Sequence, residues 1–501
     1  QTQGVTYIWQ RTASLATLFY LAAVVCYVKA RLSHRRRFAL GAFLATTLGM
    51  FTKETTFTIP LTLLFYEFSF FGPWCERGRK RVLLLLPFLL TLLIIPATMT
   101  RSGRVTLPLM QPPSMLMGIQ ESKNPLDMLT HMTQWMPVDS PEYSRYYNHK
   151  EYLLTQLNVL RTYLRLLFFP VKQNIDYDYP LARRFTQPDV LLSFFLLIAI
   201  AGVAVLAFRR NRMLTLGIFW FFIAVSVESL VLLPDVLFEH RLYLATAGFS
   251  IFLVSAAFAL LTDVRRVIAL FSVAALILSV ATFRRNAVWK DEVTLWTDAV
   301  QKSPGKARPH NNLGVAYGKR GGYGLAIAHC ERAVTLAPHH PDAHTNLAGA
   351  YAERGDIQNG DLDKAIFHCQ RALQLYPAYV KAYHNLGVAY GKMGNREKEL
   401  ASYQKVLELS PNHPDVHNNL GVVFTELNDH VHAIAHYRRA VFLRPNDAKF
   451  HFNLGVSYGK MGEHTQEMDS YQNALALDPI YVKAYHNLGA AYAESGDFDK
   501  A

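Results

Sequence analysis

Residues 380–413 read VKAYHNLGVAYGKMGNREKELASYQKVLELSPNH, and this pattern returns throughout the C-terminal part of the 501-residue chain. The dipeptide Leu386-Gly387 recurs at intervals of 34 residues, with one interval of 39 and with Leu347-Ala348 as a variant form. An aromatic residue follows each of these leucines four positions later. A proline lies near the end of each unit, at Pro304, Pro338, Pro377, Pro411, Pro445 and Pro479. The constant spacing indicates one structural unit that is repeated along the chain.

A helix-turn-helix unit of about 34 residues with these features is typical of the tetratricopeptide repeat. We therefore expect residues 286–501 to form an α-solenoid of about five and a half repeats, preceded by a half-repeat that contains Trp296 and Ala299. The five extra residues of the second repeat fall near 356–361, in the turn between its helices. Such repeats stack into a superhelix with an extended concave surface. The last residues stop partway through a repeat, so we expect the solenoid to be truncated.

An asparagine precedes each of these leucines, at Asn312, Asn346, Asn385, Asn419, Asn453 and Asn487. A side-chain amide offers both a donor and an acceptor, which matches the peptide group of an extended ligand. The row resembles the asparagine ladder of the O-GlcNAc transferase repeats, which implies peptide binding without reading of the peptide sequence. The alternative is that each asparagine satisfies local backbone groups. Histidines also recur with the repeats, but metal ligands must converge, so we predict no metal site.

The N-terminal part of the chain has a different composition, with long apolar runs such as VLLLLPFLLTLLII at residues 82–95. Over the whole chain 51% of residues are hydrophobic and 18% are charged, which excludes a disordered chain and a single soluble domain. A membrane-spanning helix needs about 20 apolar residues. We predict an all-α, polytopic transmembrane bundle in residues 1–285, with about eight spans near 12–28, 38–52, 56–72, 82–98, 189–208, 213–233, 243–261 and 267–283.

A long loop at 99–188 separates the fourth predicted span from the fifth. It contains residues 151–170, EYLLTQLNVLRTYLRLLFFP, which we interpret as an amphipathic helix at the membrane interface, with Gln156 and Asn158 on its polar side. Short loops with many Lys and Arg residues alternate along the chain with short loops that have few, as cytoplasmic and external loops should. This alternation holds only if residues 151–170 do not cross the membrane. The long loop and the repeats then lie outside the cytoplasm. We attribute the net charge of +13 mostly to the Lys and Arg residues that set the orientation of the spans in the membrane. We therefore expect no nucleic-acid partner.

Polar residues gather on the predicted external face of the bundle. Ionisable residues at membrane depth are costly and usually line a cavity or a pathway. Arginine and lysine at head-group level suit a phosphate, whereas aspartates interleaved with tyrosines suit sugar hydroxyls. The candidates for binding a donor phosphate are Lys53, Glu54, Glu239, His240, Arg241 and Tyr243. The candidates on the sugar or acceptor side are Asn174, Asp176, Tyr177 and Asp178. The alternative is a set of interface anchors and loop ion pairs.

Three stretches carry a more specific resemblance: QTQGVTYIWQRTASLATLFYL, LLFFPVKQNIDYDYP and VESLVLLPDVLFEHRLYL. Followed by the repeats, they resemble the transmembrane-and-tetratricopeptide-repeat proteins and their bacterial relatives in the GT-C glycosyltransferase superfamily. The resemblance covers nearly the whole chain. It implies an O-mannosyltransferase-like enzyme that moves a sugar, mannose in this family, from a polyprenyl- or dolichyl-phosphate donor. The acceptors would be Ser or Thr residues of proteins outside the cytoplasm.

The resemblance also implies roles for individual residues. Arg241 and Lys53 would face the lipid phosphate, with His240 and Glu239 beside them, and the two aspartates of the 174–178 segment would face the sugar or the acceptor. The catalytic acidic residue is expected in an external loop upstream of residue 1, so the catalytic residues are unknown. The spans seen here would be the later ones of about eleven. No cofactor is implied beyond the lipid-linked sugar, which is the donor substrate.

A second function is compatible with the same sequence, namely a non-catalytic membrane scaffold whose repeats assemble protein partners. A transporter is disfavoured, because no inverted repeat is apparent and the polar residues cluster at one face rather than at the midplane. The resemblance implies a bacterial inner membrane with periplasmic repeats or an endoplasmic reticulum membrane with lumenal repeats. The four cysteines form no C-x-x-C pair and are expected to fill the core.

Overall fold

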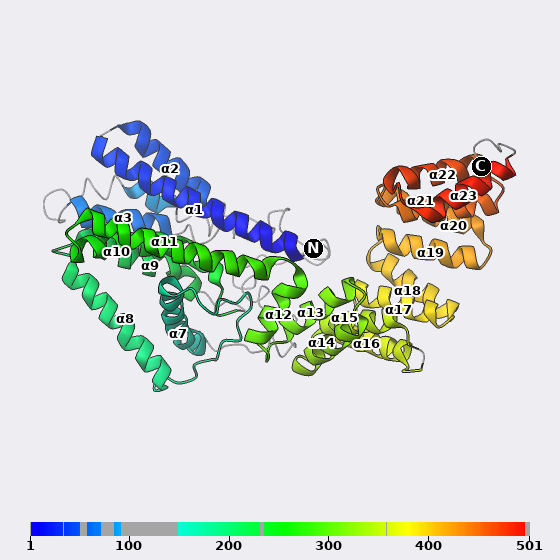
Figure 1. Ribbon diagram of the computed structural model, residues 1–501, viewed down its shortest axis with the longest axis horizontal. Helices are drawn as coiled ribbons and strands as arrows, with labels where there is room; N and C mark the ends of the chain where they lie inside the picture. The colour runs from blue at the N-terminus through cyan, green and yellow to red at the C-terminus, as the bar shows by residue number, and fades with distance from the viewer. Residues whose placement is uncertain are drawn as a thin grey trace. The chain divides into compact units, whose positions relative to one another are not determined.

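The computed structural model describes residues 2–33, 35–50, 58–71, 85–91, 149–230, 235–356 and 358–495. Within these ranges every regular element is helical, so the all-α class is confirmed (Figure 1). The contacts divide the described chain between Pro304 and Gly305 into two compact units. We call them the N-terminal unit (residues 2–304) and the repeat domain (residues 305–495) and describe each by itself.

The described part of the N-terminal unit is a set of packed helices. Its elements are α1 (Thr2–Ser33), α2 (Arg36–Met50), α3 (Ile59–Phe71), α7 (His149–Phe168), α8 (Pro188–Ala207), α9 (Arg212–Leu230), η4 (Glu239–Arg241), α10 (Leu242–Leu260), α11 (Val264–Asn286), η5 (Ala287–Trp289) and α12 (Glu292–Lys302). The helix of the expected half-repeat is α12, and its contacts group it with this unit.

Helices α9 and α10 lie side by side because two glycines let their backbones approach. A Cβ atom on Gly217 would overlap the backbone of Phe252 and the carbonyl oxygen of Gly248. A Cβ atom on Gly248 would overlap the carbonyl oxygen of Gly217 and the ring of Trp220. Small residues at a crossing point are the usual way in which apolar helices pack closely. The core beside this crossing contains the fully buried Tyr20, Ile59, Leu63, Tyr152 and Tyr163.

Three helical segments have the length and composition of a membrane span: 188–207, 242–260 and 264–289. Two shorter apolar helical segments lie at 37–48 and 212–226. The predicted spans at 12–28 and 56–72 overlap α1 and α3, which do not meet the same criteria of length and composition, and most of 82–98 lies outside the described residues. The described residues therefore support three spans, and the number eight remains a prediction.

Helix α7 differs from the expected surface helix. Gln156 and Asn158, which we placed on a polar side, are both buried. The Gln156 side chain donates to the carbonyl oxygen of Val236 at 3.0 Å, and Ser193 donates to Asn158 Oδ1 at 2.6 Å. Tertiary hydrogen bonds thus replace water around these two residues of the predicted polar side. The periodicity of one helix did not reveal that a neighbouring helix would supply polar partners.

The repeat domain consists of antiparallel helix pairs that follow one another along the chain (Figure 1). The pairs are α13–α14 (Ala307–Lys319, Tyr323–Leu336), α15–α16 (Pro341–Arg354, Asp361–Leu375), α17–α18 (Val380–Lys392, Arg396–Leu409), α19–α20 (Pro414–Glu426, His430–Leu443) and α21–α22 (Ala448–Lys460, His464–Leu477), followed by α23 (Val482–Glu494). The predicted insertion at 356–361 lies between α15 and α16, as expected.

The glycine of the Leu-Gly dipeptide has a packing role in the pairs that contain it. In the third, fourth and fifth repeats a Cβ atom on this glycine would overlap the ring of a tyrosine from the second helix. The glycine–tyrosine contacts are Gly387 with Tyr403, Gly421 with Tyr437 and Gly455 with Tyr471. The recurring dipeptide therefore sets the close approach of the two helices within a repeat.

Candidate functional site

The segment after α7 brings the predicted sugar-side residues to the turn before α10. The backbone N–H of Asn174 donates to Glu239 Oε1 at 2.7 Å, and the Tyr177 hydroxyl donates to the same oxygen at 2.6 Å. Burial raises the pKa of Tyr177, and the negative charge of Glu239 and its hydrogen bond raise it further. Tyr177 therefore stays protonated and serves as a donor to the carboxylate.

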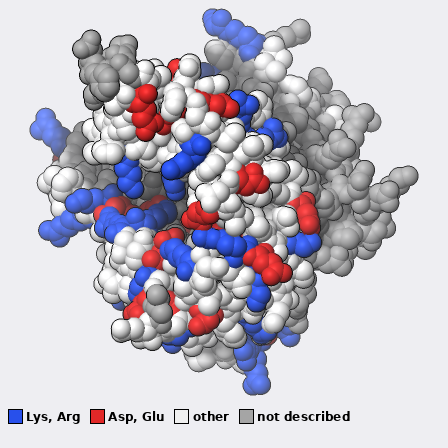
Figure 2. All heavy atoms as spheres, turned by 90° about the vertical axis from the view of Figure 1, so that its right-hand side faces the viewer, with Lys and Arg blue, Asp and Glu red and all other residues white. Residues whose placement is uncertain are grey.

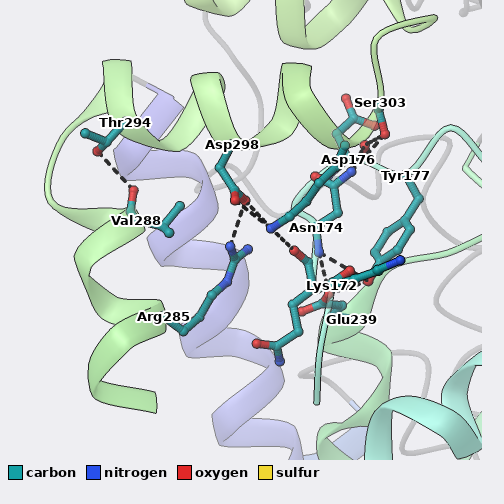
Figure 3. A network of polar contacts seen from close by, with 12 residues as sticks. Lys172, Asn174, Asp176, Tyr177, Glu239, Arg285, Val288, Thr294, Asp298 and Ser303 are labelled. Carbon is teal, nitrogen blue, oxygen red and sulfur yellow. Dashed lines mark hydrogen bonds and ion pairs between the residues drawn. The ribbon is translucent and has the colours of Figure 1, made fainter. Parts of the chain in front are cut away.

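Ser303, at the end of α12, is the centre of the same network (Figure 3). Its hydroxyl donates to the carbonyl oxygen of Asp176 at 2.8 Å. It accepts from the side-chain amide of Asn174 at 2.8 Å and from the backbone N–H of Asp178 at 2.9 Å. All three hydrogen-bonding positions of one buried hydroxyl are used, so α12 fixes the 174–178 segment over most of its length.

Two cationic side chains, Arg285 and Lys302, extend this network to Asp298. Arg285 and Lys302 each approach Asp298 Oδ2 at 2.7 Å, and Lys302 also donates to the carbonyl oxygen of Gln173 at 2.7 Å. Partial burial alone would raise the pKa of Asp298, but the hydrogen bonds and charges of Arg285 and Lys302 lower it below the usual range. The carboxylate therefore remains ionised and links α11 to α12.

The predicted phosphate-side residues do not converge in the same way. The guanidinium of Arg241 donates to the carbonyl oxygens of Asp235 and Val236 and lies over the ring of Phe238, 5.3 Å from its centroid. Tyr243 begins α10 and is 51% exposed. Lys53 and Glu54 lie outside the described residues, and of His240 only the backbone, in η4, is described.

The structure therefore unites Asn174, Asp176, Tyr177, Asp178 and Glu239, which sequence reasoning had assigned to two different groups. It adds four residues that this reasoning missed: Arg285, Asp298, Lys302 and Ser303 (Figure 3). No spacing in the sequence pointed to them, because α12 was interpreted only as part of a repeat. Chemically, the arrangement holds a carboxylate between two donors and positions a loop.

The six predicted peptide-binding asparagines are all half-buried on the first helices of the repeats. In four of them the side-chain nitrogen contacts the preceding repeat. The partner is the residue that comes directly before the equivalent asparagine of that repeat. Asn346 donates to Asn311 Oδ1 and Asn453 to Asn418 Oδ1, both at 2.8 Å, while Asn385 donates to the carbonyl oxygen of Thr345 at 3.0 Å. Asn419 makes a longer contact with His384 Nε2 at 3.4 Å. This ladder connects neighbouring first helices.

The side-chain oxygens are held more weakly. In four repeats the oxygen contacts only a side chain one residue earlier, at 3.3 to 3.5 Å: Asn311 with Asn312, His384 with Asn385, Asn418 with Asn419 and His486 with Asn487. These distances exceed the usual range for N–H···O bonds. Asn346 differs, because Lys381 donates to its oxygen at 2.6 Å.

Charges over the repeat domain are mixed. In the view of Figure 2 the basic and acidic side chains are interspersed and do not form one patch of a single sign. Some of them pair with a neighbouring repeat, as Lys392 does with Glu353 at 3.3 Å, and others pair within one repeat, as Arg444 does with Asp415 at 2.8 Å. This pattern does not favour a nucleic-acid surface, which would require clustered positive charge.

Comparison with known families agrees with the period of the sequence. Residues 356–394 and 423–462 match the description "TPR repeat", and residues 307–340, 380–413, 448–481 and 470–501 match "Tetratricopeptide repeat". The C-terminal region is a tetratricopeptide-repeat domain. No curated protein sequence matches the chain.

Several solved tetratricopeptide-repeat structures resemble this region. A MamA crystal structure is 26% identical over 30% of this chain and 86% of its own, with a TM-score of 0.28. A thermophilic protein of Thermus thermophilus is 22% identical over 37% and 99%, with a TM-score of 0.33. YrrB, described as having an unusual peptide-binding site, is 18% identical over 38% and 96%, with a TM-score of 0.29. The assignment rests on the family matches, because these TM-scores are low.

Proposed function

We propose that this protein is a membrane-anchored interaction protein whose tetratricopeptide repeats bind extended segments of protein partners outside the cytoplasm. The repeat domain itself is the observation that carries this proposal, because stacked helix pairs expose a long concave surface suited to a polypeptide. The resemblance to membrane-bound repeat proteins supports a bacterial inner membrane or an endoplasmic reticulum membrane as the location.

Anchoring in a membrane is supported by the large apolar side chains that α8 and α11 expose. On α8 these include Leu192, Phe195 and Leu206, and on α11 they include Ile268, Leu276 and Phe283, each at least 60% exposed. Contiguous apolar surface of this extent is rare on soluble monomers. Lipid would cover it, and helices of this length span the hydrocarbon layer.

The asparagine ladder supports a way of binding a peptide that leaves the solenoid intact. The side-chain nitrogens stay engaged between repeats, while the weakly held oxygens of Asn312, Asn385, Asn419 and Asn487 accept backbone N–H groups of the ligand. Exchange of a contact of 3.3 to 3.5 Å for a shorter hydrogen bond costs little.

Peptide binding by the full chain in detergent tests this proposal. Fluorescence anisotropy with an extended Ser/Thr-containing peptide should show weaker binding for a double Asn312→Ala and Asn419→Ala variant than for the parent protein. Asn359→Ala, in the exposed inserted turn, is the matched control and should bind as the parent does. Equal affinity of all three proteins would contradict the role of the ladder.

A second proposal is the glycosyltransferase reaction, with transfer of mannose from a polyprenyl-phosphate donor to Ser or Thr of the bound partner. It is supported by the resemblance and by the convergence of Glu239 with Asn174 and Tyr177 from a distant segment. Transfer requires a general base for the acceptor hydroxyl and stabilisation of the leaving phosphate. A tethered repeat domain would raise the local concentration of the acceptor.

The full chain should be supplied with polyprenyl-phosphate mannose and a Ser/Thr peptide, and the mass of the peptide should be followed. A hexose increment that is lost in Glu239→Gln and retained in Arg184→Ala, an exposed change before α8, would support the transferase. Peptide binding without any transfer by the folded parent protein would leave the scaffold as its function.

A further inference from the structure

The fifth repeat brings together three side chains of the kinds that bind metal ions. His464 and Glu467 lie one helical turn apart on α22, and Glu494 ends α23 of the next repeat. His464 Nδ1 is 3.0 Å from Glu467 Oε2 and 4.0 Å from Glu494 Oε2, and the three potential ligand atoms lie within 4.8 Å of one another. Unlike the histidines that recur with the repeats, these residues converge.

The third repeat has a fixed cation in the same register. Arg396 stands 68 residues before His464, and its guanidinium forms ion pairs with Glu399, at 2.6 Å, and with Glu426. Glu399 and Glu426 are the counterparts of Glu467 and Glu494. The two repeats therefore share a pair of carboxylates from successive helices, and in the third repeat a positive charge stands between them.

Both repeats also make room for a buried carboxylate. Glu399 and Glu467 have side chains that are only 7% and 9% exposed. Each lies against a glycine of the preceding helix, Gly391 or Gly459, where a Cβ atom would overlap the carboxylate oxygens. A carboxylate so far removed from water requires a positive partner. In the fifth repeat the residue in the place of the arginine is a histidine, and the imidazole of histidine is a common metal ligand.

We propose that His464, Glu467 and Glu494 bind one divalent transition-metal ion of the zinc class, in the position that the Arg396 guanidinium takes two repeats earlier. One imidazole nitrogen and two carboxylate oxygens are suitable zinc ligands, and water completes the tetrahedron. Ligand atoms of a tetrahedral zinc ion lie roughly 3.3 Å apart. The observed 3.0 and 4.0 Å require only a small movement of the exposed Glu494 side chain. The ion would join the fifth repeat to the sixth.

The fourth repeat provides a matched control. His430 occupies the register of His464, but Ala433 stands where Glu467 would be and Lys460 where Glu494 would be. This histidine should make no contribution to the site. Arg396→His provides the reciprocal variant, because it would reproduce all three ligands of the fifth repeat in the third.

Calorimetric titration of the full chain in detergent with Zn²⁺, after treatment with chelator, tests the proposal. We expect one equivalent to bind, with an affinity lowered by more than about tenfold in His464→Ala and in Glu494→Gln. His430→Ala should bind as the parent does, and Arg396→His should bind a second equivalent. Circular dichroism checks that each variant is folded.

Two results would overturn the site. One is the absence of a bound equivalent in the folded parent protein. The other is unchanged binding in both His464→Ala and Glu494→Gln, which would assign the metal to other histidines. The Glu494→Gln variant tests metal binding separately from folding, because Glu494 is exposed and its replacement disturbs no core contact.

Discussion

Polar side chains in the N-terminal unit form hydrogen bonds with residues that are far away in the sequence. In the repeat domain the partners are about one repeat apart. Asn174 bonds to Ser303, 129 residues away, whereas Asn453 bonds to Asn418, 35 residues away. In the repeat domain equivalent contacts form in several repeats, so the loss of one contact affects only the repeats that it joins. In the N-terminal unit each contact occurs once and depends on the whole unit being assembled. The difference predicts that single substitutions will be more damaging in the N-terminal unit.

The largest effect is expected at Glu67, which is 2% exposed in α3. It accepts from Arg31 at 2.7 and 2.9 Å and from the Tyr27 hydroxyl at 2.9 Å. Glu67→Ala removes the acceptor of these three hydrogen bonds. Breaking a buried ion pair costs about 3–5 kcal/mol. Denaturant unfolding of the N-terminal unit in detergent should show this loss.

An exposed ion pair of the repeat domain is the control for that prediction. Lys405 and Glu408 are 2.6 Å apart, and both side chains are more than half exposed. Glu408→Ala should change the free energy of unfolding little, because solvent screens such pairs. If the two substitutions had similar effects, the contrast between the two regions would be wrong.

Acid should act on the repeat domain through its pairs of histidines, two of which share one hydrogen-bond pattern. The Nε2–H of His344 donates to the carbonyl oxygen of Pro338, so its Nδ1 must accept from His368 Nδ1 at 2.9 Å. His417 and His436 repeat this arrangement at 3.1 Å. Burial, and then the neighbouring histidine, lower the pKa of His368 and of His436 to about 4.

The direction of the pH effect follows from these values. Between the ordinary pKa of 6.5 and the folded value of about 4, the unfolded chain binds protons that the folded domain does not. Stability is therefore complete above pH 6.5 and is lost as the pH falls to about 4. For the two histidines together we expect a loss on the order of 3 kcal/mol, because both are partly exposed.

Thermal unfolding as a function of pH checks this prediction. His368→Asn combined with His436→Asn retains a donor toward each partner without a group that titrates, so the slope between pH 6.5 and 4 should flatten. His486→Asn, an exposed change on α23, should keep the slope of the parent protein. The Asp298 carboxylate of the N-terminal unit should lose its stabilising effect only as the pH falls below its ordinary value of 3.8, because its pKa is lowered.

Much of the repeat domain could be predicted from the sequence. The 34-residue period, the place of the insertion and the close approach at Gly421 all depend on residues within one repeat or its neighbour, so local spacing contains the information. The role of the asparagine nitrogens could not be predicted, because it depends on which atom of the preceding repeat lies nearest.

The N-terminal unit was predictable only as a set of apolar helices. Hydropathy indicates that a segment is helical and apolar, but not which helix will satisfy Gln156 or which residue will approach Glu239. The candidate site illustrates this limit. Asn174 was identified as a polar residue of interest, yet its connection to Ser303 depends on a fold that brings together residues 129 positions apart.

A smaller effect than that of acid is expected at Ser303, which is 1% exposed. Ser303→Ala removes a hydroxyl that accepts two hydrogen bonds and donates one, so one N–H of the Asn174 amide and the backbone N–H of Asp178 lose their acceptor, while the amide keeps its other bond to the Asp176 carbonyl oxygen. Each unsatisfied buried group costs about 1–3 kcal/mol, and partial relaxation should limit the total to about 2 kcal/mol. Chemical denaturation measures this loss. Ser410→Ala, at the same place after α18, should change stability little, and an equal loss there would contradict a special role of Ser303.

The smallest effect is expected at Asn453, whose amide makes one hydrogen bond to the fourth repeat. Asn453→Ala should cost about 1 kcal/mol, the usual net value of such a bond. In a solenoid each repeat contacts only its neighbours. Hydrogen exchange should therefore rise in α19 to α22 and stay unchanged in α13 to α16. A uniform rise over all of these helices would mean that the repeats unfold as one body, and the proposed difference between the two regions would then fail at its most local contact.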